Sequence, residues 1–478
     1  MEILLVSPET VPFSKSGGLA DVVGALSKAL EEMNIGVEVF MPFYPFINKK
    51  GFKEIGTVSA NTLSGSFDAK LYRVIKDKVS YVALDHPLFS MRDGIYGASS
   101  FQPYPDNAKR FYIFSLSALL YAEESGKDIV HANDWATGIL PYLMNVRKSK
   151  AKSVYTIHNL AYQGNFSKYD ALSFGIPLDD TLFEGKVGKE RLNLMKAGIL
   201  NADLVTTVSK TYAKEILTSE FGYGLEKYLG ECSGRLIGIT NGIDTNEWDP
   251  GKDKNLKHKF SSTSLEGKEK MKKLVLEENG LEYKKDRPLF AMISRLADQK
   301  GFSELLDGDD TLMEKILQED ISFILIGTGE KRFENKLKEL EGRFSNFKAN
   351  IIFDQKESHK LEAAADFFLM PSRYEPCGLN QMYSERYGAL PIAHKTGGLE
   401  DTIVDVGENK DSGTGFLFEK MTSEEILSTV RKAIKFYNED KDGYLAARKR
   451  GMNADFTWKK SAESYIEAYK SILGRKKK

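Results

Sequence analysis

Short runs of apolar residues alternate with amphipathic, helix-like stretches along most of the chain. This alternation is typical of βαβ units, in which successive strands form a parallel sheet. In residues 17–33 the apolar side chains recur at steps of three and four, which predicts a helix with one face packed on a sheet. The runs themselves are mostly continuous, which favours strands covered on both faces. We therefore predict an α/β fold with strands within residues 2–7, 36–42, 79–85, 128–134, 153–159, 203–209, 236–242, 287–295, 321–327, 350–354, 366–372, 390–396 and 414–419.

The strand pattern stops and then restarts near the middle of the chain. Residues 245–270 are polar, contain Pro and Gly, and carry no strand signal. A chain of 478 residues is also too long for one hydrophobic core. We predict a boundary near residue 243, which gives an N-terminal domain of residues 1–242 and a C-terminal domain of residues 243–456. A final helical segment, 457–478, follows the last strand, and its pattern alone assigns it to neither domain.

Composition narrows the class of protein. The formal net charge is −1, which provides no general attraction to nucleic acid or anionic lipid. No apolar run approaches the roughly 18 residues of a membrane span, and the N-terminus reads as a buried strand rather than a signal peptide. Two cysteines exclude a disulfide framework and suggest no zinc site. We expect a cytoplasmic protein whose partners are neither nucleic acids nor membranes.

One phrase occurs twice, as KSGGLADVV in residues 15–23 and as KTGGLEDTI in residues 395–403. Each phrase follows a predicted strand and opens a predicted helix. A Gly-Gly turn at a helix start offers backbone N–H groups and the positive end of the helix dipole to an anion, for which phosphate is the natural candidate. The same turn is equally a tight connection without a ligand, because glycine is common wherever the backbone bends.

Other polar residues also collect where strands end, which is where parallel sheets bind ligands. They include three cations, Lys15, Arg295 and Lys300, and the residues His131, Asp134, His158, Asn241, Glu375 and Cys377. Each has an ordinary alternative: a surface charge, a histidine that satisfies buried groups, or a small packed cysteine. Their convergence on the same edge of two sheets favours an anionic ligand held in a cleft between the domains.

Several of these stretches resemble one family. KSGGLADVVGALSKAL, HANDWATGILPYL, YTIHNLAYQGNF, SRLADQKG, PSRYEPCGLNQMYSERYG and KTGGLEDT are similar to segments of bacterial glycogen synthases and plant starch synthases, in the same order from residue 1 to about 470. The resemblance implies a GT-B fold, in which two Rossmann-like domains face each other across a deep cleft. It also implies that the last helix crosses back to the N-terminal domain.

The resemblance further implies an activity. Family members transfer glucose from ADP-glucose to the non-reducing end of an α-1,4-glucan, such as glycogen or a malto-oligosaccharide, with retention of configuration and without a metal or other cofactor. Glu375 would lie beside the sugar and His158 near the reacting carbon, while Lys15, Arg295 and Lys300 would neutralise the diphosphate. The remaining implied substrate-binding residues are Gly17, Gly18, Asp21, Asp134, Asn241, Phe353 (expected to stack on adenine), Cys377, Gly378, Leu379, Thr396, Gly397 and Gly398.

Three positions depart from the family pattern: Phe353 stands for a common Tyr, Asn380 for Thr and Lys395 for Arg. None removes a charge that the chemistry needs. The alternatives are a GT-B enzyme that uses UDP-glucose or another acceptor, a phosphorylase with pyridoxal phosphate, and a glucan-binding scaffold without catalysis. A nicotinamide dehydrogenase fits least, because the Gly-Gly turns lack G-x-G-x-x-G. The sequence shows no second carboxylate paired with Glu375, which favours a same-face reaction assisted by the leaving phosphate over a carboxylate nucleophile.

Overall fold

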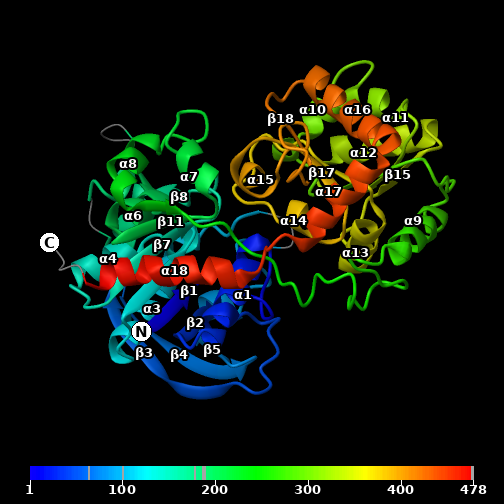
Figure 1. Ribbon diagram of the computed structural model, residues 1–478. Coiled ribbons are helices and arrows are strands. Elements are labelled where there is room, and N and C mark those ends of the chain that lie inside the picture. The colour runs from blue at the N-terminus through cyan, green and yellow to red at the C-terminus, as the bar shows by residue number, and fades with distance from the viewer. Residues whose placement is uncertain (63–64, 99–101, 177–178, 186–189, 475–478) are drawn as a thin grey trace. The chain divides into compact units, whose positions relative to one another are not determined.

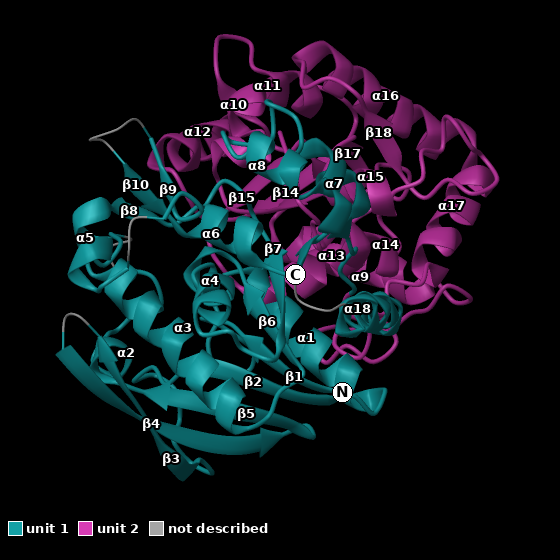
Figure 2. Cartoon of the chain, turned by 90° about the vertical axis from the view of Figure 1, so that its left-hand side faces the viewer, with its two compact units in different colours: residues 1–242, 458–478 teal, residues 243–457 magenta. Residues whose placement is uncertain are grey.

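The computed structural model describes residues 1–62, 65–98, 102–176, 179–185 and 190–474 (Figure 1). The chain forms two compact units, one of residues 1–242 with 458–478 and one of residues 243–457 (Figure 2). Each unit is built around its own mainly parallel sheet, so the predicted α/β class is confirmed. None of the described helices is both long and apolar enough to cross a membrane. Residues 475–478 of the predicted final segment lie outside the described residues.

The sheet of unit 1 has nine strands in the order β12-β11-β7-β6-β1-β2-β5-β4-β3. The first seven of these strands pair in parallel, whereas β4 and β3 add an antiparallel extension at one edge. The strands are β1 (Glu2–Val6), β2 (Gly36–Pro42), β3 (Lys53–Thr62), β4 (Gly65–Lys76), β5 (Val79–Asp85), β6 (Ile129–Asn133), β7 (Lys152–Ile157), β11 (Leu204–Thr207) and β12 (Leu236–Gly238).

The antiparallel extension was absent from the predicted strands. In β4 buried residues alternate with exposed ones, so no continuous apolar run marks the strand. A strand with one face exposed to solvent has this alternating pattern. The pattern is harder to detect in a sequence than the continuous apolar run of a strand covered on both faces. A separate small sheet, β8 (Asn165–Ser167), β10 (Arg191–Asn193) and β9 (Phe183–Glu184), was also not predicted, because its strands are too short to carry a pattern.

The helices of unit 1 connect these strands. They are α1 (Gly18–Glu32), α2 (Pro87–Ser90), α3 (Asn107–Glu124), η1 (Trp135–Thr137), α4 (Leu140–Val146), α5 (Lys168–Ser173), α6 (Leu194–Asn201), α7 (Lys210–Glu215), α8 (Glu226–Glu231), η2 (Ser233–Arg235) and α18 (Trp458–Leu473). The predicted helix in residues 17–33 corresponds to α1, and its apolar stripe is buried.

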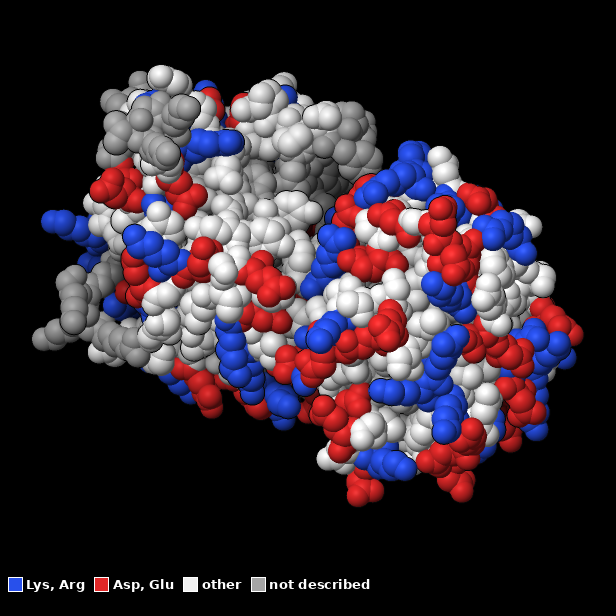
Figure 3. Space-filling model, turned by 90° about the horizontal axis from the view of Figure 1, so that it is seen from above, with Lys and Arg blue, Asp and Glu red and all other residues white. Residues whose placement is uncertain are grey.

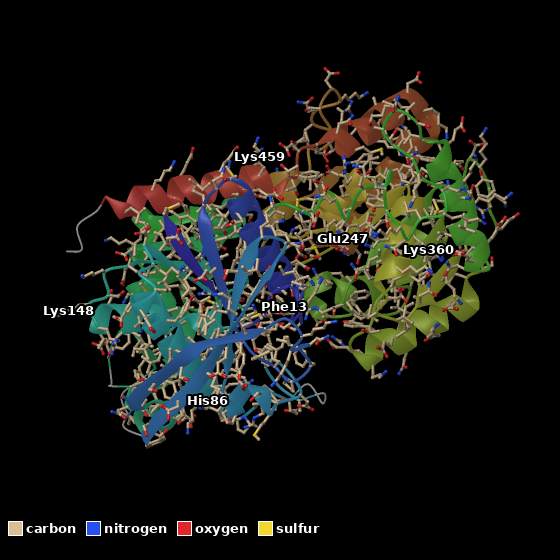
Figure 4. The ribbon with its side chains drawn as sticks, turned by 90° about the horizontal axis from the view of Figure 1, so that it is seen from below. Phe13, His86, Lys148, Glu247, Lys360 and Lys459 are labelled. Atoms are coloured by element: carbon tan, nitrogen blue, oxygen red, sulfur yellow. The ribbon has the colours of Figure 1, made fainter. Side chains whose placement is uncertain are left out.

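The last helix, α18, packs beside α1 as part of unit 1 (Figures 1 and 2). Lys459, labelled in Figure 4, stands at its start. The Tyr469 hydroxyl lies 2.8 Å from Nδ1 of His131 on β6, and both side chains are buried. The Ser461 hydroxyl donates to the carbonyl of Thr240 over 2.6 Å. The return of the C-terminal helix to the N-terminal unit, which the resemblance implied, is therefore confirmed.

Unit 2 holds a six-stranded parallel sheet in the order β15-β14-β13-β16-β17-β18. Its strands are β13 (Leu289–Ile293), β14 (Ser322–Ile326), β15 (Phe347–Asn350), β16 (Phe367–Met370), β17 (Leu390–His394) and β18 (Phe416–Phe418). Its helices are α9 (Glu266–Glu278), η3 (Asp298–Lys300), α10 (Phe302–Leu306), α11 (Leu312–Leu317), α12 (Lys331–Arg343), α13 (Gln355–Ala364), α14 (Asn380–Arg386), α15 (Gly397–Thr402), α16 (Ser423–Glu439) and α17 (Lys441–Asn453).

The strand predicted in residues 350–354 is wrong. The strand is β15, which ends at Asn350, where the predicted one begins. The apolar residues that suggested a strand lie beyond its end: Ile352 is 41% exposed and Phe353 is 92% exposed. These side chains lie in the loop at the carboxyl end of the sheet and are not part of the hydrophobic core.

Candidate active site

In unit 1, the loop from β1 to α1 carries Lys15 and the Gly17-Gly18 turn. Phe13, labelled in Figure 4, belongs to this loop. The N–H of Val11 donates to the carbonyl of Ala20 over 3.1 Å, which folds the loop back onto α1. Lys15 Nζ lies 2.8 Å from Oδ1 of Asp21, so the ammonium is held beside the first turn of the helix. Burial raises the pKa of Asp21, and the Lys15 charge opposes that shift.

The two glycines leave open space at the start of α1. A Cβ built on Gly17 or Gly18 would meet no atom of the described residues within 4 Å. However, two of the N–H groups at this turn are already occupied. Those of Ser16 and Gly17 both donate to the Glu9 carboxylate, the second over 3.2 Å. Only N–H groups from Gly18 onward therefore remain for the anion contact that the sequence predicts.

The ends of β6 and β7 place His158 against Asn133. The Asn133 amide nitrogen donates to the carbonyls of Val6 and His131, each over 3.3 Å, so its oxygen faces His158. That oxygen lies 3.0 Å from His158 Nε2, which must therefore carry the proton. Desolvation lowers the pKa of His158 to about 3, and the imidazole is neutral near pH 7. The ring thus presents Nδ1 as a hydrogen-bond acceptor.

Asp134 follows β6 in a strained backbone conformation, with φ of 60° and ψ of −179°. Its carboxylate accepts from the Trp135 N–H over 2.9 Å and caps η1. Desolvation raises the pKa of Asp134 to about 8, and the nearby Glu9 charge adds to the shift. Strain of this kind in a non-glycine residue is concentrated at functional sites.

His131 and Asn241, two other residues at strand ends, behave differently. The His131 ring is buried, with Nδ1 on Tyr469 and Nε2 on Thr156, so it is part of the interior. Asn241 is also buried, but its Oδ1 has no hydrogen-bond partner among the described residues. An orphaned acceptor at this position suits a ligand that donates a hydrogen bond.

In unit 2, the loops after β13, β16 and β17 meet around Glu375. Lys300 Nζ forms an ion pair with Glu375 Oε2, and both side chains are largely buried. The Glu375 carbonyl accepts from the Gly398 N–H over 3.0 Å. Gly301, with φ of 80°, lets the turn at Lys300 pack against the loop after β16, because a Cβ on Gly301 would come within 1.9 Å of the Pro371 carbonyl oxygen. The structure therefore brings Lys300, Glu375 and the second Gly-Gly turn together.

The segment after Glu375 forms a tight turn into α14. Cys377 is 5% exposed, Gly378 has φ of 71°, and Leu379 precedes the first residue of the helix. Gln381, which was not among the predicted residues, braces this turn. Its amide nitrogen lies 3.0 Å from the Cys377 carbonyl oxygen, 3.2 Å from that of Gly378 and 3.1 Å from the Thr402 hydroxyl.

The second Gly-Gly turn is shaped by close packing. Thr396 is buried and precedes α15, and Gly397 has φ of 47°. A Cβ on Gly398 would come within 2.0 Å of the Cys377 carbonyl oxygen. Gly398 is therefore required for contact between two loops, whereas Gly17 and Gly18 face open space.

Three further residues of unit 2 differ in their partners. Arg295 is exposed, and no ion pair involves it in the part of the chain that the structure describes. Lys395 Nζ lies 2.8 Å from Glu419, which raises the pKa of the lysine and ties it to a loop rather than to Glu375. Phe353 is almost fully exposed, as a stacking platform for a flat ring would be.

No group of three or more His, Cys, Asp and Glu side chains among the described residues is arranged to hold a metal. On the face seen in Figure 3, basic and acidic side chains lie interspersed. The chemistry at the strand ends is thus carried by cations, carboxyl groups, a neutral histidine and two glycine turns.

Comparison with known proteins identifies the family of this chain. The family described as "Starch synthase catalytic domain" matches residues 2–231, and "Glycosyl transferases group 1" matches residues 277–450. A glycogen synthase from Treponema denticola is 40% identical over 100% of this chain and 99% of its own length. The chain belongs to the glycogen and starch synthase family. It is therefore a glycosyltransferase of the GT-B class. A family member from Streptococcus mutans, also a glycogen synthase, is 38% identical over 99% of this chain and 100% of its own length.

Solved structures support the same family. The catalytic domain of starch synthase IV from Arabidopsis thaliana, bound to ADP and acarbose, is 31% identical and superimposes with a TM-score of 0.88 over 99% of both chains. Sucrose-phosphate synthase from Thermosynechococcus elongatus matches with a TM-score of 0.62 over 99% of both chains. Its identity is only 16%, so this second likeness shows the fold alone.

Proposed function

We propose that this glycosyltransferase moves glucose from ADP-glucose to the non-reducing end of an α-1,4-glucan, with retention of the anomeric configuration. The observation that carries the proposal is the contact of Lys300 with Glu375, whose carbonyl is bound to the Gly398 N–H. A cation, a carboxylate and a helix start are thereby fixed together. The starch synthase relative whose catalytic domain binds ADP and acarbose supports the choice of nucleotide and of a glucan acceptor.

The bond between glucose and diphosphate breaks with two developing charges, a negative one on the leaving ADP and a positive one on the sugar. Catalysis requires that both be stabilised as they develop. We assign the diphosphate to Lys15, Arg295 and Lys300. Phe353 offers a flat apolar face for adenine. The Oδ1 of Asn241, unpartnered among the described residues, offers a hydrogen-bond acceptor for a hydroxyl group of ADP-glucose. With three cations in these roles, the reaction we propose uses no metal ion or prosthetic group.

The sugar is assigned to Glu375 and His158. The Glu375 carboxylate is suited to oppose positive charge at the anomeric carbon. The neutral His158 ring can accept a hydrogen bond from a sugar hydroxyl at Nδ1, since Nε2 is engaged by Asn133. We propose that the acceptor hydroxyl attacks the same face that ADP leaves and gives its proton to the leaving phosphate. A glucosyl group trapped covalently on an Asp or Glu would contradict this route.

The donor assay tests the proposal directly. The purified chain is given ADP-glucose or UDP-glucose, with and without glycogen, and release of each nucleoside diphosphate is measured. We expect ADP release that depends on glycogen and exceeds UDP release. Preference for UDP-glucose would replace the proposed donor, and binding of glycogen without turnover of either donor would indicate a scaffold. We also propose a cytoplasmic location, which suits a chain whose two cysteines are both free thiols.

A further inference from the structure

Glu9, in the loop after β1, is a buried carboxylate whose role the proposed reaction does not explain. Its side chain is 2% exposed. Oε2 accepts from the Ser16 and Gly17 N–H groups, and the Ser16 hydroxyl lies 2.9 Å from Oε2 and 3.0 Å from Oε1. The Tyr96 hydroxyl donates to Oε1 over 3.1 Å. One carboxylate therefore gathers donors from the turn after Lys15 and from a segment about eighty residues away in sequence.

The carboxylate is held by neutral donors. Within the described part of the chain, hydrogen bonds from Ser16, Gly17 and Tyr96 are what oppose the effect of burial, which raises the pKa of Glu9. Burying an acid without a cation is costly, so such a residue is a poor device for stability alone. All of its donors except Tyr96 belong to the turn that follows Lys15. The free-energy cost of burying Glu9 is therefore offset mainly when the Ser16–Gly17 turn has the backbone conformation seen here.

Tyr96 is itself fixed by its surroundings. The Asn107 amide donates to the Tyr96 carbonyl over 2.8 Å, and the ring lies 5.6 Å from that of Trp135. Asn107 also accepts from the fully buried Arg110 over 2.6 Å. Tyr96 is thus held against α3 through its carbonyl and against η1 through its ring. Glu9 transmits that anchorage to the Lys15 turn.

We infer that Glu9 is a positioning residue for donor binding: it ties the Ser16 and Gly17 N–H groups to Tyr96 and thereby fixes the turn from which Lys15 and the start of α1 meet the donor diphosphate. The inference rests on the proposed function, because it takes the donor phosphates as the ligand of that turn. Without Glu9, the Ser16 and Gly17 N–H groups would lose the acceptor that fixes the backbone of this turn.

Two substitutions of Glu9 distinguish a role of its hydrogen bonds from a role of its charge. A glutamine can accept from both N–H groups with its oxygen and donate its amide protons to the hydroxyls of Ser16 and Tyr96. Glu9→Gln should therefore keep most of the positioning, whereas Glu9→Ala should lose it. If the Glu9 charge itself acted on the reaction, the two variants would fail alike.

The experiment compares these two variants with the wild type by donor kinetics and by hydrogen exchange of the peptide that contains Ser16 and Gly17. For Glu9→Ala we expect kcat/KM for ADP-glucose to fall on the order of tenfold to a hundredfold, mainly through KM, as for the loss of hydrogen bonds to a charged acceptor. Exchange should quicken at Ser16 and Gly17 without a general rise in unit 1. Glu9→Gln should stay within about threefold of wild type, a change well below one lost hydrogen bond of this kind.

A smaller change provides a second test in case Glu9→Ala does not fold. Tyr96→Phe removes one donor to Glu9, and Tyr104→Phe is its control, because the Tyr104 hydroxyl donates to Asp93 in the same segment and not to Glu9. We expect a several-fold loss of kcat/KM for Tyr96→Phe only. Equal kinetics in Glu9→Ala and wild type, or equal losses in Glu9→Ala and Glu9→Gln, would overturn the inference. Wild-type protein that turns over no ADP-glucose would instead overturn the proposed function, and the exchange data would still show whether Glu9 orders the turn.

Discussion

The Gly398 N–H donates to the carbonyl oxygen of Glu375 over 3.0 Å and joins the loops that follow β16 and β17. The contact is possible because Gly398 has no Cβ, which would come within 2.0 Å of the Cys377 carbonyl oxygen. It places the start of α15 directly against the backbone of the acid that we assign to the sugar. The geometry of Glu375 therefore depends on a glycine that carries no chemistry of its own.

Replacing Gly398 by alanine should misplace that acid. The new Cβ would come within 2.0 Å of the Cys377 carbonyl oxygen, so the loop of Glu375 must move. A displacement of about 1 Å in a catalytic group can cost on the order of a hundredfold in rate. We expect a loss of that size in kcat. Gly342→Ala on α12, where a Cβ meets nothing within 4 Å among the described residues, is the matched control and should leave kcat unchanged. A Gly398→Ala variant of normal activity would contradict the role of this crossing.

Glu375→Ala should abolish nearly all glucosyl transfer while ADP still binds. Removing a group that stabilises the transition state typically lowers kcat by about a hundredfold to a thousandfold. Its removal also leaves Lys300 without its partner, and we expect some loss of stability from the unpaired, largely buried cation. A transfer assay measures the loss of catalysis, and calorimetry with ADP checks that the variant is folded and still binds the nucleotide. Near-normal turnover would show that the acid has been assigned wrongly.

Lys15→Gln should weaken use of the donor. The lysine is paired with Asp21, but its side chain is 47% exposed and can reach a ligand. We expect the KM for ADP-glucose to rise about tenfold, which corresponds to roughly 1.4 kcal/mol of lost binding. Lys28→Gln on α1 is the control, because Lys28 pairs with Asp77 instead. Unchanged donor kinetics in Lys15→Gln would remove the assigned role.

Asp134 should make the stability of unit 1 depend on pH. Its pKa is raised by burial to about 8 in the folded protein, compared with an ordinary value of 3.8. Between these two values the folded state binds more protons than the unfolded state, so this contribution to stability falls as pH rises from about 4 to 8. Asp134→Asn cannot titrate, and its stability should decline less over this interval. Urea unfolding at pH 5 and pH 8 measures the difference, and parallel changes in both proteins would contradict the raised pKa.

Tyr469→Phe should loosen the attachment of α18. The substitution leaves Nδ1 of the buried His131 without its partner at 2.8 Å. Leaving a buried polar group unsatisfied costs about 1–3 kcal/mol. Urea unfolding of the variant should show a loss in that range. Ser471→Ala, which removes a hydroxyl that donates to the Ala468 carbonyl one turn earlier in the same helix, should show much less. Equal stability of both variants would indicate that the His131 contact contributes nothing.

The elements most predictable from the sequence were the central strands and the residues that directly follow them. Continuous apolar runs located the central strands of both sheets because these strands are covered on both faces, whereas the alternating β4 escaped notice. Lys15, His158 and Glu375 could be proposed as site residues because each follows a predicted strand, and the carboxyl ends of parallel strands lie along one edge of their sheet.

Residues that act through distant partners were not found from the sequence. Gln381 matters because it reaches Thr402, and Asn133 matters because its oxygen faces His158. Glu9 looks ordinary until Ser16 and Tyr96 are seen around it. No spacing in the sequence encodes these contacts, because each depends on how separate loops pack.

The return of α18 to unit 1 also sets an order of events during synthesis. The chain leaves unit 1 after Gly242 and re-enters it after Thr457, and the two passages are tied by a 2.8 Å hydrogen bond from the Ile243 N–H to the Phe456 carbonyl. Domains usually fold as they emerge from the ribosome, the N-terminal one first. Here the first domain to emerge is incomplete, with the face of α1 and the side chain of His131 still uncovered, until the whole of unit 2 has been translated.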